Sequence, residues 1–575
     1  MTAWWKSAVI YQVYPRSFQD SDGDGIGDLN GIRARLDHLV ALGVDALWIS
    51  PIYPSPMADF GYDVADYTGI DPRFGTLADF DALIAAAHDR GLKLLLDFVP
   101  NHSSDQHPWF TESRSSRTSP KRDWYLWADP APDGGPPNNW ISDFGGPTWT
   151  WDDATGQYYE HAFLPAQPDL NWRNPDLRAA MYDAMRFWFD RGVDGFRIDV
   201  LWHMVKAAGF PDNPPNPAFR PGMGAMHRVL QTNSTDQPEV HTIAADMRAV
   251  ADAYPDRVLI GEIYLPVPDL MAYYGTAERP EVQLPFNFQL IDAPWDAPTL
   301  HAIITDYEAA LPAGAWPNWV LGNHDRPRSA TKRGQAQAGV AAMLLLTLRG
   351  TPTLYYGDEI GLEDVAIPAD QVQDPRELRE PGLGLGRDPV RTPMPWDGSD
   401  GAGFTTGQPW LPLNPDWPTR NVATQAADPA SILNLHRTLL ALRRTHPALA
   451  LGDIHLLPSD PAILAYRRGP DILVALNLTD RPATLTLPQG DWHILCATSG
   501  TSSEPTSLAP NEGIILELEH DDPKLTRPSR AQSRDRPSEA EDASLRASRL
   551  RSKGSLDFAR DGRQSHVIPD DVITL

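Results

Sequence analysis

The sequence predicts an α/β protein built on a (β/α)8 TIM barrel, with an inserted subdomain and a C-terminal antiparallel β domain. Short β-branched runs alternate with helical patterns along most of the chain, which indicates parallel strands joined by helices. Doubly wound sheets and barrels both give this alternation. Charged residues follow the C-terminal ends of many of these runs, and a barrel assembles its active site from such strand ends. This distribution favours the barrel.

The runs predicted as barrel strands share a hydrophobic body and a polar end. They are residues 9–14, 45–50, 92–98, 193–199, 258–262, 319–325 and 353–356. Amphipathic helical patterns lie between many of them, including residues 29–42, 77–90 and 175–191. The alternation therefore extends over more than half of the chain.

Departures from the alternation define the predicted domain boundaries. Residues 1–102 and 172–444 form the two parts of the barrel, and residues 103–171, rich in Trp, Gly, Pro and Asn, are too long for an ordinary loop and form the insertion. A second irregular stretch covers about 363–421. Short alternating runs in residues 445–520 predict the antiparallel β domain. Residues 521–575, rich in Arg, Ser, Asp and Pro, are expected to be a disordered tail.

Composition argues against several classes of partner. The formal net charge of −27 opposes binding to nucleic acids and anionic membranes, although solubility alone would explain it equally well. No apolar run approaches the ~20 residues of a membrane span. The N-terminal residues show no secretory signal, so the cytoplasm is the predicted location. Cys496 is the only cysteine, which excludes an internal disulfide.

Four polar motifs follow consecutive hydrophobic runs. They are Asp97–His102, Gly195–Asp199, Gly261-Glu262 and Asn323–Asp325. Charges buried at such positions are costly unless they are paired or functional. Any one motif could be structural, but four in this arrangement predict an active site.

Two carboxylates beside an arginine suit retaining glycoside hydrolysis, in which the nucleophile and the acid/base lie about 5 Å apart. Arg197 lies two residues before Asp199, so both should project to the same side of a strand and Arg197 should keep Asp199 ionised. Glu262 must be protonated at rest, which requires a raised pKa. A metal-dependent hydrolase could use the same residue types and stays open as an alternative.

With these motifs the sequence resembles glycoside hydrolase family 13, the α-amylase superfamily, in its α-glucosidase and oligo-1,6-glucosidase branch. The resemblance runs from Trp4 to about Leu518. It implies the (β/α)8 barrel, an inserted B domain after the third strand and the C-terminal β domain. It also implies specific roles: Asp199 as nucleophile, Glu262 as general acid/base, Asp325 as transition-state stabiliser, Asp97 as a structural acid, and His102, Arg197 and His324 as substrate-binding residues.

Further motifs resemble the closed glucose pocket of this branch. Asp59 corresponds to the acid that holds the terminal glucose hydroxyls, and Tyr62 to the tyrosine that stacks on the ring. Arg391 resembles the arginine that pairs with this acid and closes the pocket. Phe163 resembles a further aromatic wall. A closed pocket accepts chain ends only, so the resemblance implies an exo-acting enzyme rather than an α-amylase.

An acidic loop near the N-terminus predicts a structural cation. Carboxylates alternate along it with a glycine at the turn, as in calcium loops, but Gly31 stands where a bidentate Glu would complete the pattern. A helix-capping acidic turn is the alternative reading. The branch commonly holds calcium here, so Ca²⁺ is expected, with Mg²⁺ as the alternative, and no organic cofactor. The expected ligands are Asp20, Asp22, Asp24, Ile26 and Asp28.

The expected activity is that of a retaining α-glucosidase that releases α-glucose from the non-reducing ends of short α-glucosides and transfers glucose to sugar or alcohol acceptors. Val200 resembles the residue found in α-1,6-specific enzymes, whereas the Gly261–Pro266 segment resembles enzymes acting on α-1,4 disaccharides. Oligo-1,6-glucosidase is therefore the runner-up, and trehalose synthase and sucrose isomerase are minor alternatives. A non-catalytic, transporter-associated homologue is disfavoured, because all three acids are present and no membrane helix is visible.

Overall fold

Eight parallel strands form the central sheet of the protein. The computed structural model describes residues 2–500 and 504–519, so the predicted disordered tail, 521–575, lies outside the described residues. The strands are β1 (Ile10–Val13), β2 (Ala46–Ile49), β3 (Lys93–Phe98), β7 (Gly195–Ile198), β8 (Val258–Gly261), β9 (Leu284–Asn287), β10 (Asn318–Trp319) and β11 (Thr353–Tyr355).

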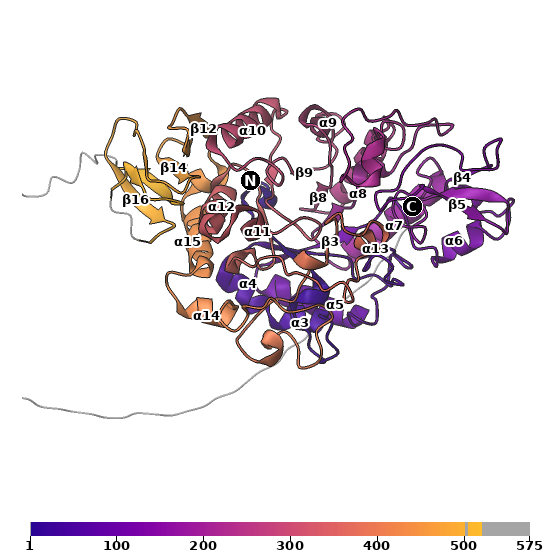
Figure 1. Ribbon diagram of the computed structural model, residues 1–575, viewed down its shortest axis with the longest axis horizontal. Coiled ribbons are helices and arrows are strands. Elements are labelled where there is room, and N and C mark those ends of the chain that lie inside the picture. The colour runs from indigo at the N-terminus through magenta and orange to yellow at the C-terminus, as the bar shows by residue number, and fades with distance from the viewer. Residues whose placement is uncertain (1, 501–503, 520–575) are drawn as a thin grey trace, which may run out of the picture. The chain divides into compact units, whose positions relative to one another are not determined.

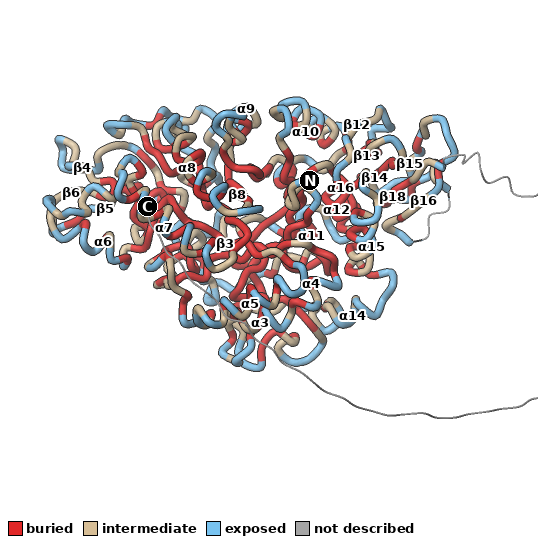
Figure 2. The backbone as a smooth tube through the Cα atoms, turned by 180° about the vertical axis from the view of Figure 1, so that it is seen from behind, coloured by how far each residue is buried: buried red, intermediate tan, exposed pale blue. Residues whose placement is uncertain are grey.

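The sheet closes on itself. Its strands run in the order β10-β9-β8-β7-β3-β2-β1-β11, and every neighbouring pair is parallel. A parallel bridge between Val320 and Thr353 joins the two ends of this order. The fold is therefore a TIM barrel and not an open doubly wound sheet, as the spread of polar strand ends predicted. The strands are buried almost throughout (Figure 2).

Helices cover the outside of the barrel, and some of them begin at a side chain that caps the helix. Thr76 and Asp79 form a capping box at α5, and the Asn174 side chain accepts hydrogen bonds from two backbone N–H groups at the start of α7. The main barrel helices are α3 (Leu29–Ala34), α4 (Leu36–Leu42), α5 (Leu77–Asp89), α7 (Pro175–Asp190), α8 (Val240–Asp252), α9 (Val267–Ala272), α10 (Ala297–Ala310), α11 (Ser329–Arg333), α12 (Gln335–Thr347) and α15 (Ile432–Thr445).

Shorter helical turns lie mostly in the connections. They are α1 (Trp4–Ser7), α2 (Pro15–Phe18), α13 (Pro375–Arg379), α14 (Val422–Ala427), α16 (Pro447–Leu451), and the 3₁₀ turns η2 (Leu201–His203), η3 (Ala225–Arg228), η4 (Asp358–Ile360), η5 (Asp388–Val390) and η6 (Asp400–Gly403). The stretch 363–421, predicted to be irregular, contains only such short turns.

Three predictions of secondary structure were wrong in detail. Strand β9 was not predicted, and the strand predicted at 319–325 is the two-residue β10. The polar Asn323–Asp325 segment lies in the turn beyond β10. The helix predicted at 29–42 is two helices, because Arg35 adopts φ −101° and ψ 5° at their junction. Such boundaries depend on tertiary packing more than on periodicity.

The connection after β3 carries its own small sheet. Strands β4 (Trp127–Ala128), β6 (Gln157–Glu160) and β5 (Trp149–Asp152) pair antiparallel in this order, beside α6 (Pro108–Ser113) and η1 (Arg122–Trp124). Aromatic side chains form much of its core. The rings of Phe110 and Trp127 stack with centroids 5.7 Å apart, and Tyr159 meets both edge-on. In Figure 1 this sheet lies far from the C-terminal strands.

The C-terminal residues form a five-stranded antiparallel sheet, in the order β12-β13-β14-β18-β16, and a two-stranded sheet of β15 and β17. The strands are β12 (Ile454–Leu457), β13 (Ile463–Arg468), β14 (Ile472–Asn477), β15 (Ala483–Thr484), β16 (Trp492–Ala497), β17 (Ser507–Leu508) and β18 (Gly513–Leu518). Helix α12 contacts β14, β18 and α15, and ten of its thirteen residues are buried. Within the described residues, no helix is long and apolar enough to span a membrane.

Candidate active site

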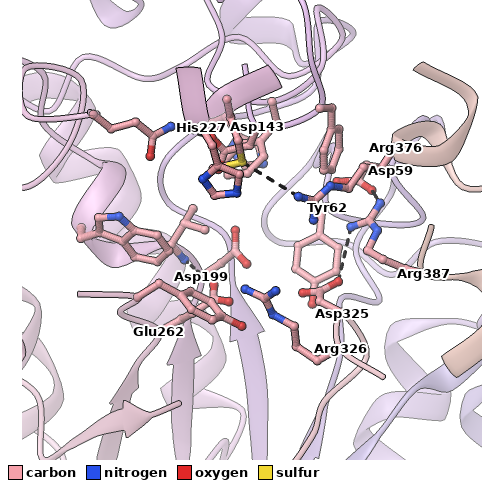
Figure 3. A pocket seen from close by; sticks show the side chains of 18 of the residues that line it. Asp59, Tyr62, Asp143, Asp199, His227, Glu262, Asp325, Arg326, Arg376 and Arg387 are labelled. Atoms are coloured by element: carbon pink, nitrogen blue, oxygen red, sulfur yellow. Dashed lines mark hydrogen bonds and ion pairs between the residues drawn. The ribbon is translucent and has the colours of Figure 1, made fainter. Parts of the chain in front are cut away.

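A cavity of about 600 Å³ opens at the C-terminal ends of the barrel strands. Loops from three regions surround it: the connections that follow the strands, the insertion after β3, and the 374–391 stretch. Figure 3 shows Asp199 and Glu262 at the strand ends, with Asp59 and Arg387 across the cavity beyond Tyr62. Seven of the predicted site residues line it: Asp59, Tyr62, His102, Phe163, Asp199, Glu262 and Asp325.

Arg197 holds two of these carboxyls in fixed orientations. Its Nη1 donates to Asp199 Oδ1 at 2.6 Å, and its Nη2 lies 2.8 Å from Glu262 Oε2. Nη1 also donates to Asp97 Oδ1 at 2.7 Å. The same-side placement expected from the period of a strand is therefore confirmed. Asp199 Oδ2 and Glu262 Oε1 accept no hydrogen bond from any described residue, so these two oxygens are available to a substrate.

Three buried carboxyls around one guanidinium leave an excess of negative charge. Burial raises the pKa of Asp199, of Glu262 and, to about 6, of Asp97, while Arg197 lowers the pKa of all three. Mutual repulsion adds to the rise, because Glu262 faces Asp325 and Asp199 faces both Glu262 and Asp97. Such a cluster favours keeping a proton, as a carboxylic acid that must donate one requires. The expectation that Arg197 keeps Asp199 ionised is not met, because burial and the two neighbouring acids outweigh the guanidinium and raise the pKa of Asp199 well above its usual range.

Asp325 lies in the opposite electrostatic environment. Its Oδ1 accepts from Arg391 Nη2 at 2.7 Å and lies 3.4 Å from Arg387 Nη1, and its Oδ2 is 3.3 Å from His324 Nε2. Burial raises the pKa of Asp325, but His324 and the two guanidinium groups lower it by more and hold it well below its usual range. Asp325 is therefore ionised, in contrast to Asp199 and Glu262, whose pKa values are raised by burial and by repulsion from neighbouring acids.

His324 is fixed by a chain of hydrogen bonds across the barrel. The Gln12 amide lies 2.8 Å from His324 Nδ1, and Tyr62 Oη lies 2.6 Å from Nε2. Tyr62 Oη in turn donates to Asp97 Oδ2 at 3.0 Å. The Tyr62 and His324 rings are parallel within 3°, with centroids 5.4 Å apart. Burial lowers the pKa of His324 well below its usual value, although the neighbouring Asp325 raises it.

The pairing predicted for Asp59 was wrong. Asp59 Oδ1 accepts from Arg387 Nη2 at 2.6 Å, and the same nitrogen donates to Asp374 Oδ1 at 2.7 Å. Arg391, the expected partner, donates to the His324 backbone carbonyl and to Asp325 instead. Both arginines lie on one loop, four residues apart, and the turn η5 between them directs Arg387 towards Asp59.

Amide and aromatic groups complete the same end of the cavity. Gln167 Nε2 donates to Asp59 Oδ2 at 3.2 Å and lies 3.1 Å from His102 Nε2. The His102 and Phe163 rings contact each other with centroids 5.1 Å apart. Burial lowers the pKa of His102 to about 4, so this ring is neutral. Neutral hydrogen-bonding groups, a carboxylate and aromatic rings are a suitable lining for a sugar.

Several residues that line the cavity belong to none of the predicted motifs. Arg326 directly follows the Asn323–Asp325 motif, and Arg387 precedes Arg391 in the same segment, so proximity to a motif could have found both. No pattern marks the others, which come from loops and from the short turns η2, η3 and α13. They include Asp143, Phe144, Trp202, Met226, Leu230, Gln231 and Arg376.

The acidic loop forms only part of the predicted metal site. Carboxylate oxygens of Asp20, Asp22 and Asp28 lie within 4.8 Å of one another, but Asp24 does not join them. Its Oδ1 accepts from the Ile26 backbone N–H at 2.7 Å. Burial and repulsion from the other three acids raise the pKa of Asp24, and none of the four forms an ion pair with a described Lys, Arg or His. Uncompensated hard oxygens of this kind fit a divalent cation.

Comparison with known proteins identifies the scaffold. The family described as "Alpha amylase, catalytic domain" matches residues 12–452, and a domain of unknown function, DUF3459, matches residues 438–515. A probable alpha-glucosidase of Rhizobium meliloti is 42% identical over 84% of this chain and 91% of its own length. An oligo-1,6-glucosidase of Heyndrickxia coagulans is 39% identical over 90% and 100%.

Solved structures agree with this assignment. The α-glucosyl transfer enzyme XgtA is 40% identical, superposes with a TM-score of 0.86, and matches 90% of this chain and all of its own. The trehalulose synthase MutB of Pseudomonas mesoacidophila is 37% identical with a TM-score of 0.82 over the same shares. Taken with the barrel and the carboxyl groups at its mouth, these matches show that the chain belongs to the α-amylase family, glycoside hydrolase family 13.

Proposed function

We propose that the chain is a retaining α-glucosidase that removes single glucose units from the non-reducing ends of short α-glucosides. The observation that carries the proposal is the arrangement around Arg197, which fixes one oxygen of Asp199 and one of Glu262 and leaves the other oxygen of each free. A nucleophilic carboxylate and a protonated carboxyl on one support are what double displacement at an anomeric carbon requires.

Asp199 Oδ2 attacks the anomeric carbon while Glu262 Oε1 gives its proton to the leaving glycosidic oxygen. The resulting glucosyl ester on Asp199 is then attacked by water, or by a sugar or alcohol acceptor, with Glu262 acting as base. Two inversions return the α-anomer. The ionised Asp325 lies on the same cavity and would stabilise the positive charge that develops at the sugar ring.

Exo-action is supported by the Asp59–Arg387 pair. Both side chains are at least nine-tenths buried, and Asp374 on the far side of Arg387 is fully buried. A substrate chain could not continue past these residues without breaking the pair. The other oxygen of Asp59, Oδ2, accepts a hydrogen bond from Gln167, and Asp59 lines the cavity, so its carboxylate is placed to accept hydrogen bonds from the hydroxyls of a terminal glucose.

For the linkage, a general α-glucosidase is the first candidate and an oligo-1,6-glucosidase is the second. Val200 lines the cavity directly after Asp199, in favour of α-1,6 linkages, and relatives of both names share about 40% of the sequence. Purified protein given maltose, isomaltose and sucrose would decide. Faster turnover of isomaltose than of maltose would favour the second candidate, and accumulation of a sucrose isomer would favour an isomerase.

Product stereochemistry tests the mechanism itself. NMR of the first product formed should show α-glucose before mutarotation. A β-glucose first product would contradict retention, and an unreactive protein in the whole panel would contradict the proposed function.

For the acidic loop we propose a structural Ca²⁺, with Mg²⁺ as the alternative. Asp20, Asp22 and Asp28 would provide the carboxylate ligands. The loop precedes α3 and contacts the 405–408 segment, where Thr405 donates to Asp20, so the ion would brace two segments far apart in the sequence. None of these acids lines the cavity, and the ion would take no part in catalysis.

A further inference from the structure

Val200, the residue after Asp199, has a strained backbone. Its φ of 36° and ψ of 46° place it in the left-handed region. Eight described non-glycine residues have positive φ, and Val200 is the only β-branched one among them. The left-handed region is costly for any residue with a Cβ, and a β-branched residue there is a genuine outlier. Such strain persists only where surrounding contacts enforce it.

The strained backbone donates its N–H group to Glu262. The Val200 N–H donates to Glu262 Oε2 at 2.9 Å, the same oxygen that Arg197 Nη2 approaches at 2.8 Å. The φ angle sets how the peptide plane carrying this N–H is turned relative to the chain that follows, here η2. An ordinary negative φ would turn the N–H away from Glu262, or else turn η2 away from the wall of the cavity.

Two donors on Oε2 leave little room for a proton there. An oxygen that already accepts from an amide and a guanidinium would have to give up one of these bonds to carry a hydrogen atom. Oε1 accepts no hydrogen bond from any described residue. A proton on the Glu262 carboxyl therefore belongs on Oε1.

We propose that Val200 is a positioning residue, whose left-handed backbone aims its N–H at Glu262 Oε2 and thereby assigns the proton of the general acid to Oε1. This inference rests on the proposed function, because it gives Glu262 the role of acid. Val200 itself touches the acid and not the reacting atoms. The strained backbone is retained because it places the Val200 N–H against Glu262 Oε2.

A pH profile should report the contact, because the N–H stabilises the ionised form of Glu262. Other groups act on the same carboxyl and stay in place when the contact is removed. The groups that face Glu262 are Asp97, Arg197, Asp199, Tyr264, Asp325 and Arg326. Loss of the Val200 donor alone should therefore raise the pKa of Glu262.

The direct test replaces Val200 by its α-hydroxy acid, which turns the amide into an ester and deletes the N–H while keeping the side chain. We expect the alkaline limb of kcat/KM to move up by about one pH unit, the effect of losing one hydrogen bond to an ionised carboxylate, and kcat to fall. An alkaline limb that coincides with that of the wild type would overturn the positioning role.

A second measurement concerns the backbone and needs no activity. Glycine tolerates positive φ, whereas alanine does not, so Val200→Gly should melt at a higher temperature than Val200→Ala. Val193 is the matched control, because it is fully buried and is not among the residues with positive φ. Val193→Gly should melt below Val193→Ala. The same order at both positions would overturn the inference.

Different results would refute the proposed function and the positioning role of Val200. A wild-type protein that releases no glucose from any substrate would refute the proposed function, and the positioning role with it. An active wild type whose ester variant keeps the normal alkaline limb would refute the positioning role alone.

Discussion

Replacing Arg387 by lysine would test the closed end of the cavity most sharply. Arg387 Nη2 donates hydrogen bonds to Asp59 at 2.6 Å and to Asp374 at 2.7 Å, and Arg387 Nε donates a further one to Asp374 at 3.1 Å. Lysine keeps the charge but cannot reproduce this fork. The shorter ammonium group should stay with Asp374, which accepts from three atoms of residue 387 including its backbone N–H.

The expected effect follows from the bond that Asp59 loses. A hydrogen bond to a charged group contributes about 1.5–3 kcal/mol. A loss of about 1.5–3 kcal/mol at the terminal glucose corresponds to a fall of about 10- to 150-fold in kcat/KM. Most of it should appear in KM, because the glucose hydroxyls are bound in both the ground state and the transition state.

The assay is steady-state hydrolysis of maltose and isomaltose, with circular dichroism to confirm folding. Arg191→Lys is the matched control, since Arg191 pairs with Asp81 at 2.8 Å on the surface, and its kcat/KM should stay within about twofold of the wild type. A folded Arg387→Lys variant with kcat/KM within threefold of the wild type would refute the assignment of Arg387 to the glucose-binding end.

Three further outcomes are expected. Asp199→Asn should lower kcat by about four orders of magnitude, because the isosteric amide is not a nucleophile. It should not lower Tm, because it removes one of three crowded acids. Near-normal turnover would exclude Asp199 as nucleophile. Since burial raises the pKa of Glu262 and this group must be protonated, kcat/KM should fall as the pH rises through that pKa, and Glu262→Gln should abolish the alkaline limb for substrates with activated leaving groups. Chelation should lower Tm with little immediate loss of activity, and Ca²⁺ should restore it; immediate, complete inactivation of folded protein would indicate a catalytic metal.

The sequence predicted the barrel because its strands are short, buried and followed by polar residues. The four motifs were located correctly at the mouth for the same reason: parallel strands bring their carboxyl ends together whatever the connections do. Strand β9 escaped prediction because its residues, Leu-Pro-Phe-Asn, contain a proline and no β-branched side chain. Its place in the sheet is set by the neighbours β8 and β10.

Loop geometry could not be predicted in this way. Arg387 and Arg391 share a segment without periodicity, so only the folded turn between them decides which one reaches Asp59. Asp24 belongs to an alternating acidic pattern, yet its carboxyl bonds to the Ile26 N–H and stays out of the cluster. The strain at Val200 has no signature at all, since valine is among the residues least suited to its conformation.

Helix α12 has a consequence for how this chain tolerates change. It is apolar on nearly every side, and the C-terminal sheet covers the face that the barrel leaves open. A chain shortened to end after Leu451 would expose that face to water as a continuous apolar surface and would be prone to aggregate. The strands beyond Gly452 therefore cannot be removed alone. A stable chain without them would need polar residues on the exposed face of α12.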